Sequence, residues 1–231
     1  MLASAAARID GLPQDHLILD VGGWAAPMSR ADWVIDLLPY ETRGLYVHRP
    51  DPAQERFGAD TWVQRDICGA APWPFADKQF DFAVCSHTLE DVRDPLRVCE
   101  ELCRVAKAGY VEVPAPIQEL TFGLHGPWVG WSHHHWITEL EGEGLRFTMK
   151  PHLLVEEGRH LPEGSTEGLT PEELVLQLWW EEGFAFREQA VLGVEEFDAW
   201  LFGLVEECRA RAAPVGTPDG RWSRLRRRVR G

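Results

Sequence analysis

The stretch from His16 to Asp36 most constrains how this chain can fold. It holds two short apolar runs, Leu-Ile-Leu and Trp-Val-Ile, and each run ends in an aspartate, Asp20 or Asp36. Short apolar runs rich in β-branched residues are typical of buried parallel strands. Gly22-Gly23 follows the first run, and a glycine turn there lets a ligand approach the backbone closely. An acid after the second run can accept two hydrogen bonds from a ribose diol. The stretch therefore predicts a nucleoside-binding α/β domain.

Length and composition fit one domain of this kind. The 231 residues suffice for an α/β domain with an insertion, and 45% hydrophobic with 26% charged residues is typical of a globular protein. No apolar run approaches the roughly 18 residues of a membrane span. The first ten residues lack the basic leader and apolar core of a secretory signal. Five scattered cysteines favour buried thiols in a reducing compartment, so we expect a cytoplasmic protein.

The net charge of −14 is unevenly distributed. The last eleven residues, RWSRLRRRVRG, contain six arginines and no acid, so the other 220 residues have a net charge of −20. An acidic body argues against nucleic-acid binding by the folded part. We expect the arginine-rich segment 214–231 to be disordered, although it could contact RNA, anionic lipid or an acidic surface. Nothing in the sequence indicates an oligomeric state.

Strands and helices are predicted to alternate along the first half of the chain. After a helix at 3–9 and the two strands above, the apolar patterns predict strands at 61–67, 80–85 and 110–114. Asp94-Pro95 begins a helix that runs to Gly109, because aspartate caps a helix and proline suits its first position. This alternation predicts a parallel sheet wound on both faces.

Beyond residue 116 the pattern changes. Gly, Trp and His are abundant up to residue 136, and the runs 137–140 and 145–150 flank Glu-Gly-Glu-Gly, which predicts a hairpin. Thr170-Pro171-Glu172-Glu173 predicts the start of a helix that ends near residue 182. A strand at 184–192 and a helix at 194–212 follow. We expect a core at 1–116, a cap-like insertion that also completes the sheet at 117–192, a closing helix at 193–213 and the tail at 214–231.

With these elements in order, the motifs resemble those of the class I S-adenosyl-L-methionine-dependent methyltransferases over roughly residues 14–116. The matching segments are ILDVGG at 18–23, VID at 34–36, DI at 66–67, WPF at 73–75, FDFAVCSHTLEDV at 80–92 and EELCRV at 100–105. A glycine turn after a strand is weak evidence alone, whereas these segments together, in the right order and at the right spacing, are strong evidence. The resemblance implies a doubly wound, mostly parallel, seven-stranded Rossmann-like sheet with S-adenosyl-L-methionine across the strand ends.

The resemblance also implies cofactor contacts. Asp36 would bind the ribose hydroxyls, Asp66 the adenine amine, and the backbone of Gly22-Gly23 would pass beneath the methionine moiety. The methyl group on the sulfonium is an electrophile, so catalysis needs an in-line nucleophile and, for a hydroxyl acceptor, a base. The candidate cofactor-binding residues are Asp20, Gly22, Gly23, Trp24, Asp36, Leu37, Asp66, Ile67 and Ser86.

Two departures from the family pattern concern the first motif. The family usually shows Asp/Glu-x-Gly-x-Gly-x-Gly, whereas Trp24 and Ala26 occupy the second and third glycine positions. Only sixteen positions separate Asp20 from Asp36, which is short for a turn, a full helix and a strand. We therefore expect the first helix to shrink to a proline-containing turn. These departures are also compatible with a domain that has lost catalysis.

His87 is a candidate general base. It follows the fourth predicted strand, and ligands of such sheets lie outside the carboxyl ends of the strands. An imidazole that titrates near neutrality suits that role. The alternative is a histidine that hydrogen-bonds a neighbouring loop or the cofactor's carboxylate.

His133-His134-His135 forms the other cluster, with several tryptophans nearby. In a strand, His133 and His135 would share a face, a spacing that can bind a metal. The alternatives are acid–base catalysis or a wall over a substrate pocket, and structural packing. We take His87, His133 and His135 as candidate catalytic residues and assign no metal ligand. The candidate substrate contacts are Trp128, Trp131, His134 and Trp136.

The sequence thus predicts a methyltransferase that acts on a small-molecule acceptor. Because histidines crowd the expected site, an oxygen acceptor is favoured, and similar domains accompany glycan or natural-product pathways, which favours a sugar or secondary metabolite. The altered glycine motif supports an alternative, a catalytically inactive methyltransferase-like binding or scaffold protein. A third possibility, metal-assisted chemistry, depends on the histidine cluster alone.

Overall fold

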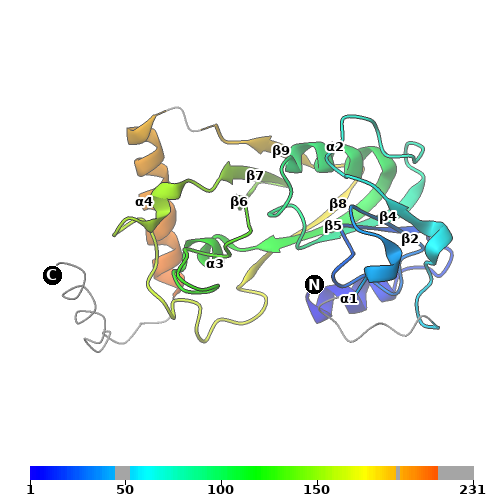
Figure 1. Cartoon of the computed structure of the whole chain (residues 1–231), viewed down its shortest axis with the longest axis horizontal. Coiled ribbons are helices and arrows are strands. Elements are labelled where there is room, and N and C mark those ends of the chain that lie inside the picture. The colour runs from blue at the N-terminus through cyan, green and yellow to red at the C-terminus, as the bar shows by residue number, and fades with distance from the viewer. Residues whose placement is uncertain (45–52, 191–192, 213–231) are drawn as a thin grey trace.

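A six-stranded sheet forms the centre of the molecule (Figure 1). The computed structural model describes residues 1–44, 53–190 and 193–212, so the predicted arginine-rich tail lies outside the described residues. The strand order is β3-β2-β1-β4-β5-β8; the first five strands are parallel, and β8 runs antiparallel to β5. The strands are β1 (Ile18–Val21), β2 (Trp33–Asp36), β3 (Trp62–Gln64), β4 (Phe80–Ser86), β5 (Ala106–Pro114) and β8 (Val175–Glu181).

The predicted mostly parallel α/β fold is confirmed, whereas the predicted count of seven strands in one sheet is wrong for the described residues. Three further strands form a separate sheet in the order β6-β7-β9. These are β6 (Trp136–Glu141), β7 (Gly144–Met149) and β9 (Ala185–Glu188). The predicted hairpin is confirmed by the antiparallel pairing of β6 with β7. β9 pairs with β7 instead of extending the main sheet.

The main sheet is buried on both faces because its strand residues alternate between two hydrophobic cores. Leu19 contributes to the core beneath α2 (Pro95–Val105), and Ile18 contributes to the core beneath α1 (Ala3–Asp10). In β4, Ala83 and Val84 divide in the same way. The two helices therefore cover opposite faces of the sheet (Figure 1). This double burial explains the short, continuous apolar runs in the sequence.

Helix α2 begins where the sequence predicts and ends earlier. The Asp94 carboxylate accepts a hydrogen bond from the Arg97 amide at 3.0 Å, and Pro95 occupies the first turn. The helix ends at Val105, and β5 begins at Ala106, so Gly109 lies within a strand. A Cβ at Gly109 would lie 2.5 Å from the Ala83 carbonyl oxygen. This glycine therefore allows close approach of neighbouring strands and does not end the helix.

The predicted helix from Thr170 to residue 182 is wrong. The local start signal does form, since the Thr170 amide donates to the Glu173 carboxylate and the Glu173 amide donates to the Thr170 hydroxyl. From Val175 onward, however, the chain becomes β8 and pairs with β5 along its whole length. Trp179 and Trp180, expected on a helix, are therefore strand residues. The ladder of interstrand hydrogen bonds and the burial of Trp180 outweigh the single capped turn.

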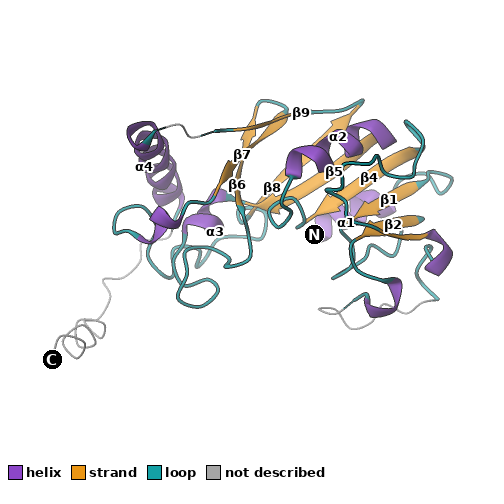
Figure 2. Cartoon of the chain, turned by 45° about the horizontal axis from the view of Figure 1, so that its top comes forward, coloured by secondary structure: helices purple, strands orange, loops and turns teal. Residues whose placement is uncertain are grey.

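The C-terminal part of the described chain builds a third hydrophobic core. It is formed largely by α3 (Pro116–Leu120), β6 and α4 (Val194–Arg211), and it confirms the predicted closing helix. Figure 2 shows the small sheet lying between the main sheet and α4. The described residues also contain three 3-10 helices, η1 (Tyr40–Thr42), η2 (Ala59–Thr61) and η3 (His152–Val155).

Two further sequence predictions can be compared with the structure. No helix follows β1, and residues 22–30 form turns and bends, which confirms the predicted loss of the first helix. The five cysteines form no disulfide, and four of them are buried, which confirms the prediction of buried thiols. No described helix combines the length and the apolar character that crossing a membrane requires.

Candidate active site

The turn after β1 requires glycine at both positions. Gly22 has φ +74°, and a Cβ there would lie 2.3 Å from the Thr88 hydroxyl oxygen. A Cβ at Gly23 would lie 2.2 Å from the Asp20 carboxylate. The Gly22 amide donates to the Ile35 carbonyl at 2.9 Å, so the turn is tied to β2. The turn backbone therefore packs directly against the Thr88 and Asp20 side chains, which leave no room for a side chain at either glycine.

Asp20 is a buried acid at the end of β1. It is 4% exposed, and its Oδ2 accepts a hydrogen bond from the Met28 amide at 2.8 Å. Burial raises its pKa to about 7, and the charge of Asp36 acts in the same direction, while the Met28 hydrogen bond opposes the shift. An acid whose pKa is displaced this far by its surroundings is characteristic of a functional site.

Asp36 is held at the end of β2 by backbone donors. Its Oδ2 accepts from the Trp24 amide at 3.0 Å, and its Oδ1 accepts from the Leu38 amide at 2.8 Å. Burial raises its pKa, and these amides act against the shift. A carboxylate oxygen can accept more than one hydrogen bond, so Asp36 retains acceptor capacity for further donors.

A cavity of about 120 Å³ lies at the carboxyl ends of β1 and β4. In the strand order these two strands mark the switch point, where the chain direction along the sheet reverses and ligands of open α/β sheets bind. Ligand pockets commonly measure about 300–1,000 Å³. With residues 22–30 in their present conformation, this cavity therefore holds only part of a nucleoside cofactor. Four predicted cofactor-binding residues line it: Asp20, Gly22, Gly23 and Ser86.

The other predicted cofactor-binding residues lie outside the lining of this cavity. The Trp24 indole donates to the Thr42 hydroxyl at 3.0 Å. Leu37 is 61% exposed, whereas Ile67 is buried in the core beneath α2. Asp66 accepts from Arg93 at 2.6 Å and from the Cys68 amide at 3.0 Å. Its hydrogen bond from the Arg93 guanidinium lowers the pKa of Asp66.

His87 lies between two buried acids. Its Nε2 is 3.0 Å from Glu112 Oε1, and its Nδ1 is 3.4 Å from Glu90 Oε1. Burial disfavours the charged imidazole, but the hydrogen bonds to Glu112 and Glu90 outweigh burial and raise the pKa of His87 to about 9. Burial likewise works against the charge of Glu112, but hydrogen bonds from His87, the Leu2 amide and Tyr110 lower its pKa to about 2. At neutral pH His87 is therefore a charged donor, which favours the hydrogen-bonded alternative over a general base.

A second polar cluster lies between the β4–α2 connection and the C-terminal part. His134 Nδ1 is 2.5 Å from Glu119 Oε1, and Glu119 is 1% exposed. Lys150 Nζ donates to the other Glu119 oxygen at 2.7 Å. On the opposite edge of the ring, His134 Nε2 is 3.7 Å from Asp91 Oδ1. Glu119 and Lys150 belong to this cluster although the sequence gives no local motif for either.

The three consecutive histidines do not form a strand. β6 begins at Trp136, so the expectation that His133 and His135 share a strand face is wrong. His133 instead contacts His134, with ring centroids 4.6 Å apart. Burial lowers the pKa of His133. The His135 amide donates to the Glu90 carbonyl at 2.7 Å, and this hydrogen bond fixes the loop against the β4–α2 connection.

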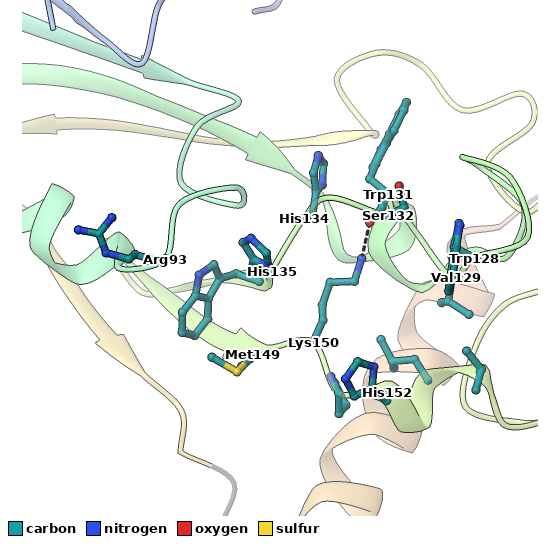
Figure 3. Close-up of a pocket in the computed structure, with 14 residues that line it drawn as sticks. Arg93, Trp128, Val129, Trp131, Ser132, His134, His135, Met149, Lys150 and His152 are labelled. Atoms are coloured by element: carbon teal, nitrogen blue, oxygen red, sulfur yellow. Dashed lines mark hydrogen bonds between the residues drawn. The ribbon is translucent and has the colours of Figure 1, made fainter. Parts of the chain in front are cut away.

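The predicted substrate residues line a second cavity, of about 500 Å³ (Figure 3). Figure 3 shows the Lys150 amine reaching toward Trp131, whose carbonyl accepts its hydrogen bond at 3.0 Å. The Trp136 indole donates to the Val92 carbonyl at 2.8 Å, whereas Trp128 is 55% exposed. The lining includes Trp128, Trp131, His134, His135, Trp136 and Lys150. We call this space the cap cavity.

The segment 87–93 connects the two regions. Its first residue, His87, lines the cavity at the ends of β1 and β4, and its last, Arg93, lines the cap cavity. No described residue lines both cavities. Five residues named from the sequence line the first cavity and five line the cap cavity, but the sequence did not show that one short connection separates the two cavities.

Residues 46–111 match the family model described as a methyltransferase domain. The match begins after β2, so it does not include Gly22-Gly23 or Asp36. No curated protein matches this chain.

Solved structures similar to this chain include a complex of the Haloferax volcanii Trm112 methyltransferase activator with a putative methyltransferase, at 18% identity and a TM-score of 0.37, covering 48% of this chain and 50% of that chain. YcgJ from Bacillus subtilis is 19% identical with a TM-score of 0.38 and the same coverage. A possible histamine N-methyltransferase from Thermotoga maritima is 20% identical with a TM-score of 0.35, covering 52% of this chain and 53% of that chain. The matched region spans about half the length of each.

Proposed function

We propose that this chain, a member of the class I S-adenosyl-L-methionine-dependent methyltransferase superfamily, transfers a methyl group to a small-molecule acceptor. The methyltransferase-domain match over residues 46–111 supports the family, which confirms the resemblance predicted from the sequence. The observation that carries the proposal is the pair of buried acids, Asp20 and Asp36, on either side of the glycine turn at adjacent strand ends. Burying two acids costs stability, so a binding role explains their presence.

The residues around this turn suit the donor that the family implies. S-adenosyl-L-methionine supplies a methyl group activated by a sulfonium. We expect Asp36 to accept hydrogen bonds from the ribose diol and the Gly22-Gly23 backbone to lie against the methionine part. Asp66 and Ile67 would contact the adenine.

We expect the segment 24–30 to move when the donor binds, because the cavity of about 120 Å³ is smaller than a nucleoside cofactor needs. This segment has no helix, and it is held across the site by two amide hydrogen bonds, from Trp24 to Asp36 and from Met28 to Asp20. Releasing these bonds frees acceptor sites on both carboxylates. Donor hydroxyl and amine groups can then replace the backbone amides without leaving a buried charge unpaired.

We place the acceptor in the cap cavity. Indole rings with an ammonium and an imidazole nearby suit a molecule that has flat apolar faces and hydroxyl groups. This supports O-methylation of a sugar or secondary metabolite. His135, exposed beside the cavity, is the remaining candidate for acid–base work, because His87 is charged at neutral pH and His133 does not line the cavity. In this proposal residues 1–116 bind the donor and residues 117–192 cap the acceptor.

A second candidate function is a methyltransferase-like binding or scaffold protein without catalysis. The small cavity and the amides already bonded to Asp36 favour it. The two functions differ in whether the donor site opens.

Isothermal titration with S-adenosylhomocysteine separates them. We expect micromolar binding to the wild-type chain and at least about tenfold weaker binding to Asp36→Ala, because charge-assisted hydrogen bonds to the ribose are lost. Asp60→Ala, which removes an exposed carboxylate in η2, is the matched control and should bind as the wild type does. Circular dichroism checks that each variant is folded. If the wild type shows neither binding heat nor thermal stabilisation, the result contradicts the methyltransferase proposal and favours the binding protein.

A further inference from the structure

We propose that Asp91, His133 and His134 bind a divalent transition-metal ion where the β4–α2 connection meets the cap. Each residue offers one ligand atom, a carboxylate oxygen or an imidazole nitrogen, and these atoms all lie within 4.8 Å of one another. The sequence pattern suggested His133 with His135 as a metal pair. The structure brings together a different pair of histidines and adds an acid from a distant segment.

The strongest support is the way His134 is oriented. Its Nδ1 lies 2.5 Å from the buried Glu119 carboxylate, so the ring nitrogen that remains for another ligand is Nε2, on the edge that faces Asp91. Lys150 holds Glu119 in place from the other side. Metal-binding histidines characteristically donate their second ring N–H to a carboxylate, which fixes the tautomer and raises the basicity of the ligand nitrogen.

The local charge also favours a cation. Asp91, Glu119 and Glu90 bring three carboxylates to this region, against two cations, the Lys150 ammonium on Glu119 and the His87 imidazolium 3.4 Å from Glu90. With His133 and His134 uncharged, as metal binding requires, these groups have a net charge of about −1. Two imidazoles and one carboxylate are ligands of ions such as Zn²⁺, Co²⁺ or Ni²⁺, whereas Ca²⁺ and Mg²⁺ prefer oxygen ligands.

Binding requires a modest contraction of the site. Ligand atoms around a tetrahedral ion with bonds of about 2.0–2.1 Å are about 3.3 Å apart. His134 is fixed by Glu119, but Asp91 and His133 are exposed, so their side chains are free to rotate toward it. Three protein ligands leave a coordination position open, as in catalytic zinc sites. Because His134 also lines the cap cavity, the open position would lie beside that cavity.

The test is titration of the metal-free full-length chain with Zn²⁺, followed by calorimetry, and with Co²⁺, followed by its visible absorption. We expect one ion per chain. His133→Ala and Asp91→Asn should each weaken Zn²⁺ binding at least tenfold. His135→Ala is the matched control, since it removes an exposed histidine two positions away from His133, and it should bind Zn²⁺ as the wild type does.

Glu119→Gln tests the orienting role. Loss of a carboxylate that hydrogen-bonds a metal-binding histidine typically weakens metal binding about 10- to 100-fold. Because Glu119 is buried, circular dichroism must show a folded variant before its titration is used; Asp91→Asn and His133→Ala, both exposed, decide the proposal by themselves. No binding to the wild type, or equal weakening in His133→Ala and His135→Ala, would overturn it. These titrations contain no methyl donor, so their result is independent of the proposed methyltransferase activity.

Discussion

Asp20 shows at the scale of one residue what a buried acid costs in stability. Its folded-state pKa is about 7, against an ordinary 3.8. The folded protein therefore binds more protons than the unfolded chain between these values, and stability falls as the pH rises through this window. Above about pH 7 the cost is complete, because the buried carboxylate is charged.

We predict that Asp20→Asn stabilises the protein and that the gain grows with pH. Asparagine keeps an acceptor for the Met28 amide but carries no charge. The increase in unfolding free energy over the wild type should be larger at pH 8 than at pH 5 by on the order of 2 kcal/mol. Urea denaturation at the two pH values measures it. A gain that does not change with pH would mean that Asp20 does not titrate as described.

His87 and Glu112 form an ion pair whose two members have opposite pH dependences. The pKa of His87 rises from 6.5 to about 9, so its stabilisation is fully present below pH 6.5 and is lost as the pH rises through 9. The pKa of Glu112 falls from 4.5 to about 2, so its contribution is present above pH 4.5 and is lost as the pH falls through 2. The pair stabilises most between about pH 4.5 and 6.5.

His87→Gln should therefore lower the melting temperature more at pH 6 than at pH 9.5. Glutamine can bond to Glu112, but it cannot carry a charge. His87 is 41% exposed, and solvent weakens the ion pair, so the prediction concerns the direction of the difference. Thermal melts of wild type and variant at both pH values test it. An equal deficit at both would show that His87 acts through packing alone.

At the scale of the element, the turn after β1 is more constrained than other glycine turns. Gly22 and Gly142 both have positive φ, but a Cβ at Gly142 would meet nothing within 4 Å, whereas at Gly22 it would meet Thr88. We predict that Gly142→Ala costs about 1 kcal/mol, the left-handed strain alone. Gly22→Ala should cost at least about 2 kcal/mol more, because Thr88 must shift in a packed site.

Chemical denaturation of the two glycine variants measures the difference. Comparable losses for both would contradict the close contact between the β1 turn and Thr88. The sequence could predict this turn because the two glycines are adjacent, follow an apolar run and precede no competing element.

Elements fixed by local signals were predictable, and elements fixed by distant partners were not. Asp94 and Pro95 begin α2 as expected, because a cap and a first-turn proline act within four residues. The capping signal at Thr170 is equally local and also forms, yet the chain continues as β8 because β5 is already in place to pair with it. No local sequence signal in residues 170–181 indicates that this segment pairs with β5.

At the scale of the whole molecule, one part of the candidate site could be predicted from the sequence and the other part could not. The acids and glycines at the ends of β1 and β2 follow from strand order, so their meeting was predictable. Glu119, His134 and Lys150 come from three different segments, and only the folding of the cap against the β4–α2 connection brings them together. His133 and His135 were wrongly paired because a loop, rather than a strand, carries them.

The proposed donor site lies at the ends of β1 and β2, and in this proposal the segment 24–30 keeps it closed. Amide hydrogen exchange with and without S-adenosylhomocysteine tests it most directly, because it locates the ligand and reports the movement together. We predict altered exchange at the amides of Trp24, Met28 and Leu38, which are hydrogen-bonded to Asp36 or Asp20. Unchanged exchange across residues 18–38, or changes confined to the lining of the cap cavity, would contradict a donor site at the ends of β1 and β2.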